Sequence, residues 1–170
     1  YMCNKIWFCG DFMTSKNLSN LMKIIIIIFG ICGIVLYGIT VFKGFDFING
    51  YPLNATKNLP WMIFLLITGI PCYAVLYQGW RIANTISTDG AFCKDNSRRL
   101  KVIGILALIT SVYHFIGDTT FLLLGTINTP LYLCEILIFV IGIAIAITSF
   151  VLSYLTSKAT TIKEENDLTI

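Results

Sequence analysis

Apolar and polar residues alternate along the chain in long blocks. Four blocks are almost wholly apolar, at 24–42, 59–80, 102–124 and 131–155, and short polar segments separate them. A helix needs roughly 20 apolar residues to cross a hydrocarbon core about 30 Å thick. The pattern therefore predicts an all-α, polytopic membrane protein whose four transmembrane helices form an up-down bundle.

Composition supports a membrane class and leaves no room for a second domain of ordinary size. Of the 170 residues, 56% are hydrophobic and only 12% are charged, whereas soluble domains carry about 25% charged residues. We expect an N-terminal tail at 1–21, a membrane domain at 22–157 and an acidic tail at 158–170. Residues 1–12 lack a signal-peptide pattern. We expect the native protein to start at Met13, with Met22 as the alternative.

Lysine and arginine are unevenly distributed among the polar segments. Three precede the first apolar block, five lie between the second and the third, and two follow the fourth, which places ten of the twelve on one side. Positively charged loops tend to stay in the cytoplasm. Both termini and the middle loop, 81–101, are therefore expected to be cytoplasmic.

Two local patterns predict details of helix packing. Asp95, Asn96 and Ser97 offer side-chain oxygens that could cap the third helix. Small residues that let helix backbones approach closely are the second pattern. They occur as the pairs Gly30 with Gly33, Ala107 with Ser111, and Gly142 with Ala146.

A proline interrupts the second apolar block near its middle. Pro71 cannot donate a backbone hydrogen bond to the carbonyl of Ile67, so we expect a kink there. Membrane helices tolerate proline when neighbouring groups satisfy the freed carbonyl. Two interpretations remain open. The kink only shapes the helix, or it forms a hinge or a ligand-binding notch.

Three ionisable residues fall within the apolar blocks, namely His114, Asp118 and Glu135. Counting 1.5 Å per residue from each predicted boundary places both acids roughly 6 Å below the outer surface, on neighbouring helices. His114 lies four residues before Asp118, and therefore on the same helix face. We expect one polar cluster under the outer surface.

Such a cluster is open to two interpretations. Burial favours the uncharged form of each acid, and the group could hold a proton, a cation or a polar ligand. Alternatively, both acids reach up to the lipid headgroups, and His114 forms a hydrogen bond with a backbone or side-chain group that has only a structural role.

Known catalytic and ligand-binding motifs are missing from the sequence. None of the six cysteines forms a C-x-x-C pair, and there is no H-E-x-x-H segment. We therefore expect no enzymatic activity, no cofactor and no dedicated metal site.

Charged residues at the predicted cytoplasmic end are candidates for docking a partner. They could equally anchor the topology and attract anionic lipid. The candidates are Arg81, Arg98, Arg99 and Lys101 in the middle loop, and Glu164, Glu165 and Asp167 in the tail.

Short segments in a fixed order carry a family resemblance. They are LPW at 59–61, IPCY at 70–73, GWRIA at 79–83, AF at 91–92, DN at 95–96, LK at 100–101 and ENDLTI at 165–170. In these segments the chain, from about residue 13 onward, resembles a bacterial family of four-helix membrane proteins, the domain-of-unknown-function family 2975.

The resemblance implies a protein of the bacterial cytoplasmic membrane. Members of the family are often encoded beside a small helix-turn-helix regulator, which suggests a membrane partner for a cytoplasmic DNA-binding protein. No catalytic residues are established for the family, and direct binding of nucleic acid is not expected. The first functional hypothesis is therefore a non-enzymatic membrane partner of such a regulator. The alternative is a small transporter, or an ion- or proton-binding protein, that uses the intramembrane carboxyl pair.

Overall fold

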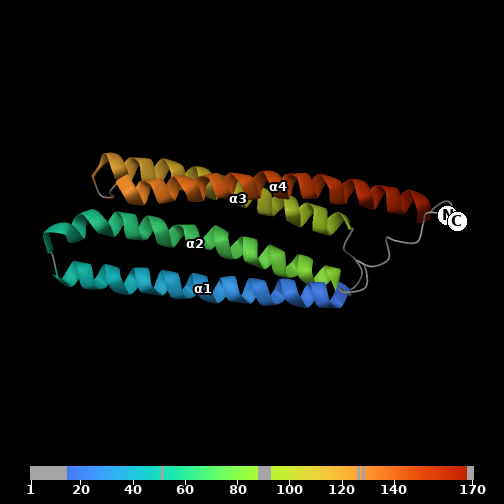
Figure 1. Cartoon of the computed structure of the whole chain (residues 1–170), viewed down its shortest axis with the longest axis horizontal. Helices are drawn as coiled ribbons and strands as arrows, with labels where there is room; N and C mark the ends of the chain where they lie inside the picture. Colours follow the sequence, from blue (N-terminus) through green and yellow to red (C-terminus); the bar gives the residue numbers. More distant parts are fainter. Residues whose placement is uncertain (1–14, 51, 88–92, 126, 128, 168–170) are drawn as a thin grey trace, which may run out of the picture.

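Four long helices make up the computed structural model (Figure 1). The structure describes residues 15–50, 52–87, 93–125, 127 and 129–167. For residues 40–50, 52–58, 61, 131 and 167 it describes the backbone alone. The helices are α1 (Ser15–Gly50), α2 (Pro52–Ile86), α3 (Lys94–Leu123) and α4 (Thr129–Asp167). Each is long and apolar enough to cross a membrane, which confirms the predicted all-α membrane fold. Residues 1–12 and the expected start at Met13 lie outside the described residues.

Consecutive helices run antiparallel and pack side by side. α1 packs against α2, α2 against α3, and α3 most extensively against α4. No contact joins α1 to α4 within the described ranges. The up-down bundle is therefore an open row of helices, in which the α3–α4 pair is the tightest unit. Figure 1 shows α1 and α2 side by side, with α3 and α4 together on the other side of α2.

Burial in this bundle is the reverse of that in a soluble protein. Large apolar side chains such as Phe29, Ile70 and Ile116 are more than half exposed, whereas Thr68 and Asp118 are buried between helices. Lipid is as apolar as these exposed side chains, so association of the helices depends on close packing and on polar groups that meet partners inside.

Small residues allow α3 and α4 to approach closely. A Cβ atom added at Gly104 would lie 3.2 Å from the carbonyl oxygen of Ala146, and one added at Gly142 would overlap the hydroxyl of Ser111. The predicted role of Ser111, Gly142 and Ala146 at a helix interface is thus confirmed. Gly30 differs, because a Cβ atom there would meet nothing within 4 Å.

Polar contacts join the helices at the end of the bundle where α1 and α3 begin. Ser19 Oγ donates to the carbonyl of Ala83 at 2.7 Å, which ties α1 to α2. Ser97 Oγ donates to the carbonyl of Ser153, and Ser153 Oγ donates to the carbonyl of Ser97, both at 2.7 Å. This reciprocal pair fixes the register of α3 against α4.

The cap of α3 differs from the sequence prediction. Cys93 is the N-cap residue, and its sulfur accepts a hydrogen bond from the backbone N–H of Asn96 at 3.4 Å. Asn96 and Ser97 already lie inside the helix, where their side chains bond to Arg99 and to Ser153. The Ser97 hydroxyl is therefore engaged with α4, and the amide oxygen of Asn96 accepts from a residue of its own helix.

All four helices begin before their predicted spans, and α1, α2 and α4 also end beyond them. α2 continues through both Pro60 and Pro71, so Pro71 lies within one long helix and its predicted kink stays a prediction. α4 continues to Asp167, well beyond the predicted span end at residue 155. In Figure 1 the final turns of α4 project past the other helices, so most of the expected acidic tail is helical.

Candidate functional site

The three intramembrane ionisable residues lie together between α3 and α4. His114 Nδ1 is 3.3 Å from Asp118 Oδ2 and 3.9 Å from Glu135 Oε2. One ligand atom from each of the three side chains lies within 4.8 Å of the other two. The structure therefore places in one cluster the two acids that the sequence put at one depth and the histidine one turn from Asp118.

Helix geometry and a tight turn explain how the cluster forms. His114 and Asp118 are four residues apart on α3, and so point the same way one turn apart. α3 ends at Leu123, and Gly125 adopts a positive φ of 68° that turns the chain toward α4. Glu135 lies two turns into α4, on the part of that helix that the turn brings back beside Asp118.

Burial distinguishes the cluster from carboxylates that reach the headgroups. The Asp118 side chain is only 1% exposed, and those of His114 and Glu135 are 13% and 12% exposed. Asp118 Oδ1 and Glu135 Oε2 have no hydrogen-bond partner among the described residues. Buried polar atoms nearly always find partners, so two unsatisfied acceptors side by side need a physical explanation.

Aromatic and polar neighbours enclose the cluster. The Phe64 ring of α2 meets the His114 ring edge-on, with centroids 5.5 Å apart. One turn from the cluster, Thr119 Oγ1 and Tyr132 Oη hydrogen-bond across α3 and α4 at 3.0 Å. Nothing in the sequence pattern singled out Phe64, because it is one of many apolar residues in its block.

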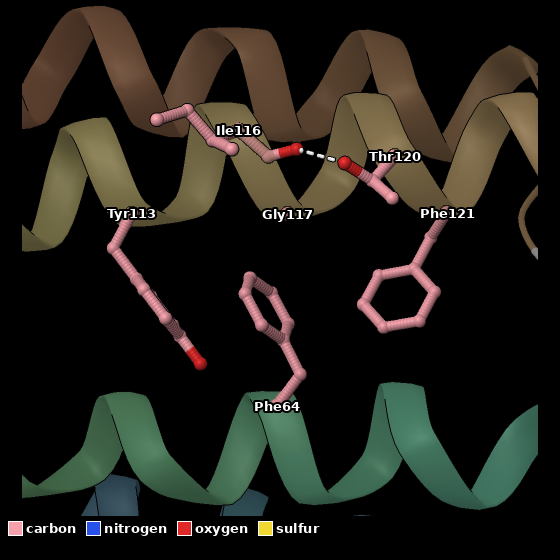
Figure 2. Close-up of a pocket in the computed structure, with 6 residues that line it drawn as sticks. All are labelled: Phe64, Tyr113, Ile116, Gly117, Thr120 and Phe121. Atoms are coloured by element: carbon pink, nitrogen blue, oxygen red, sulfur yellow. Dashed lines mark hydrogen bonds between the residues drawn. The ribbon is translucent and has the colours of Figure 1, made fainter.

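An apolar groove of about 320 Å³ lies next to the cluster, between α2 and α3. Figure 2 shows Phe64 projecting from α2 toward Gly117, between the rings of Tyr113 and Phe121. The hydroxyl of Thr120 in the groove already donates to the carbonyl of Ile116 at 2.8 Å. The groove therefore offers a surface for hydrocarbon and no group to hold an ion.

The residues proposed for docking have different surroundings. Arg98 and Lys101 are exposed, as are Glu164 and Glu165. Exposed Arg81 has its guanidinium 6.0 Å from the Tyr77 ring centroid. Glu164 pairs with Lys94 of α3 at 2.8 Å. The side chain of Asp167 lies outside the described set.

Arg99 is instead part of the helix packing. Its guanidinium donates to the carbonyl of Arg81 at 3.2 Å, to Thr85 Oγ1 at 2.9 Å and to Asn96 Oδ1 at 3.3 Å. The first two bonds join the start of α3 to the end of α2, and the third lies within α3.

Comparisons with known proteins identify a family of unknown function and a relative that is a membrane protein. Residues 44–170 match the family model described as "Protein of unknown function (DUF2975)". The chain is 33% identical over 110 residues to the uncharacterized membrane protein YoaS of Bacillus subtilis (strain 168). That alignment covers 64% of this chain and 69% of the relative. No solved structure matches the chain.

Proposed function

We propose that this protein binds a cation inside the bilayer. The chain belongs to the DUF2975 family of proteins of unknown function. In this proposal His114, Asp118 and Glu135 form the binding site of a small transporter or ion-binding protein that is not an enzyme. The family supplies no activity, so the proposal depends on the site.

The observation that carries the proposal is the unsatisfied oxygen of Asp118. This carboxyl group is almost fully buried, and its Oδ1 atom has no hydrogen-bond partner in the described part of the chain. Leaving such an atom unpaired in a low-dielectric interior costs about 1–3 kcal/mol. A cation bound between the two carboxyl groups would compensate for the missing hydrogen bonds, which supports a binding role. Intramembrane carboxylates commonly mark ion pathways.

Flux measurements in lipid vesicles test this function. The full chain is reconstituted, and entry of protons, Na⁺, K⁺ and divalent cations is followed with ion-sensitive dyes. We expect at least one cation to enter, and Asp118→Asn and Glu135→Gln to reduce its rate or its binding. Glu164→Gln is the matched control, because this acid is exposed and pairs with Lys94. If no cation binds or crosses above the level of empty vesicles, the proposal is wrong.

The second candidate function is a membrane partner for a cytoplasmic helix-turn-helix regulator. It is favoured by the projecting end of α4, where Lys163, Glu164 and Glu165 are exposed on a helix that continues past the bundle. The excess of lysine and arginine at this end supports a cytoplasmic location for it. In this proposal the protein lies in the cytoplasmic membrane with both termini inside.

Affinity purification from the native membrane tests the partner function. Deleting residues 163–170 should release a co-purifying DNA-binding protein, and Asp118→Asn should leave it bound. If the regulator is absent from the intact protein, or is retained after the deletion, the partner function is wrong.

A further inference from the structure

We propose that His114, Asp118 and Glu135 together ligate one divalent first-row transition-metal ion, of the Zn²⁺ or Mn²⁺ type. This inference rests on the proposed cation-binding function and names the class of ion. It also revises the sequence expectation of no dedicated metal site.

The spacing of the three ligand atoms suits one small ion. Ligands bound tetrahedrally at about 2.0–2.1 Å from a metal lie about 3.3–3.4 Å from each other. The His114 Nδ1 to Asp118 Oδ2 distance is 3.3 Å, and the Nδ1 to Glu135 Oε2 distance is 3.9 Å. All three ligand atoms lie within 4.8 Å of one another. Small rotations of the Glu135 side chain would bring its oxygen to the common distance.

Charge balance favours a divalent ion. Two carboxylates and a neutral imidazole carry a charge of −2, and a divalent cation makes the site neutral. A monovalent cation would leave one net negative charge buried, which is costly in a low-dielectric environment. Asp118 has 1% of its side chain exposed, so water contributes little to balancing that charge.

The ligand types select among divalent ions. Mg²⁺ and Ca²⁺ prefer sites made wholly of oxygen ligands, whereas imidazole with carboxylates suits transition metals such as Zn²⁺, Mn²⁺ and Fe²⁺. Metal sites of this kind are built in helical bundles from facing helices. Here α3 supplies His114 and Asp118, and α4 supplies Glu135.

Access to the site is compatible with exchange of an ion. His114 and Glu135 each keep a small exposed edge, at 13% and 12% of the side chain, whereas the Asp118 side chain is 1% exposed. Three protein ligands leave the fourth tetrahedral position of the metal ion open to water or to another ligand.

Spectroscopy on the intact protein tests the assignment directly. His114 is the only histidine in the sequence, so ¹⁵N-histidine labelling reports on this residue alone. The full chain is purified with a tag that lacks histidine, placed in phosphatidylcholine nanodiscs, stripped with chelator and loaded with one equivalent of Mn²⁺. We expect the electron–nuclear double resonance spectrum to show coupling between Mn²⁺ and ¹⁵N. A spectrum of fully hydrated Mn²⁺, without this coupling, would overturn the proposal.

Equilibrium binding of Zn²⁺ provides the second measurement. It uses a background in which all six cysteines are replaced, so that thiolates do not bind the ion. We expect one Zn²⁺ per chain. Asp118→Asn, Glu135→Gln and His114→Ala should each weaken binding by more than the roughly 10–100-fold typical of losing an outer-shell partner. Glu164→Gln should not change it. Equal binding by all variants contradicts the assignment.

The two proposals fail in different ways. If protons or monovalent ions bind in an Asp118-dependent manner while Mn²⁺ and Zn²⁺ do not, the metal assignment is wrong and cation binding stands. If no cation binds, both are wrong. The Asn and Gln variants keep the size of the native side chains, and the labelled wild-type spectrum does not depend on any variant folding.

Discussion

Asp118 of α3 and Glu135 of α4 point their carboxyl groups at the same imidazole nitrogen. The two acids approach Nδ1 of His114 at 3.3 and 3.9 Å, and each retains a buried oxygen without a hydrogen-bond partner in the described structure. Proteins often sacrifice stability where a site must bind something. This relationship gives the first prediction.

Replacing Asp118 with asparagine should stabilise the cation-free protein. The asparagine amide can donate to the unsatisfied oxygen of Glu135, and the substitution removes a buried acid, so we expect a gain of about 1 kcal/mol in the free energy of unfolding. Denaturant or thermal unfolding in detergent after chelator treatment measures it. A marked loss of stability would show that the carboxyl group is a structural element.

Adding a methyl group at Gly117 should loosen the contact between α2 and α3. Its Cβ atom would overlap the Phe64 ring, which is also stacked on Tyr113 with centroids 4.6 Å apart. We expect Gly117→Ala to cost about 1–3 kcal/mol, measured by thermal unfolding. Phe64→Leu should recover part of the loss.

Gly30→Ala is the control for that substitution. A Cβ atom at Gly30 meets nothing within 4 Å, and alanine is favoured over glycine in a helix by about 0.5–1 kcal/mol. Equal effects at Gly30 and Gly117 would argue against the described packing of Phe64.

The reciprocal hydrogen bonds between Ser97 and Ser153 should act as a unit. Each hydroxyl donates to the other residue's carbonyl at 2.7 Å. We expect Ser97→Ala and Ser153→Ala each to cost about 0.5–1.5 kcal/mol, and the double variant to cost less than their sum. Thr148→Ala is the control, since its exposed hydroxyl bonds only within α4. Strict additivity would contradict the coupling.

Arg99 and Arg98 should differ although they are neighbours in sequence. Arg99 makes three hydrogen bonds at the α2–α3 junction, whereas Arg98 is exposed. Arg99→Ala should cost about 1.5–3 kcal/mol, as for bonds to a charged group. Arg98→Ala should stay within about 0.5 kcal/mol. A loss for Arg99→Ala as small as that for Arg98→Ala would show that Arg99 does not stabilise the fold.

The positive-inside pattern predicts the orientation. In a cysteine-free background, Thr129→Cys should react with a membrane-impermeant maleimide in intact cells. A protein that keeps Cys93 alone should react only after the membrane is permeabilised. Labelling of Cys93 in intact cells would reverse the orientation.

Much of the fold was predictable because membrane helices are specified locally. Block length and composition identify a span without any knowledge of its neighbours, and the four expected helices are present. Helix ends were less accurate. Cys93 rather than Asp95, Asn96 or Ser97 caps α3, and the Ser97 hydroxyl bonds to Ser153 of α4 instead. α4 continues to Asp167.

The candidate site was only half predictable. Residue counting gave Asp118 and Glu135 a common depth, and helix periodicity put His114 on the same helix face as Asp118. Depth does not fix rotation about the helix axis. Whether Glu135 faces α3 depends on how Gly142 and Ser111 set the close approach of α3 and α4. Arg99, a candidate for docking, also bonds to Arg81 and Thr85 of α2, a contact that residue spacing alone does not reveal.

The sequence by itself determined that this protein resides in a membrane and how many helices span it. It also showed that three ionisable residues lie among apolar ones, at a cost in free energy. These follow from hydrophobicity and from the fixed rise of a helix, which are local properties. Only the tertiary structure decided that those three residues share one buried site, with Phe64 of α2 against His114. Contacts between helices depend on rotation and register, and these are set by side chains that lie far apart in the chain.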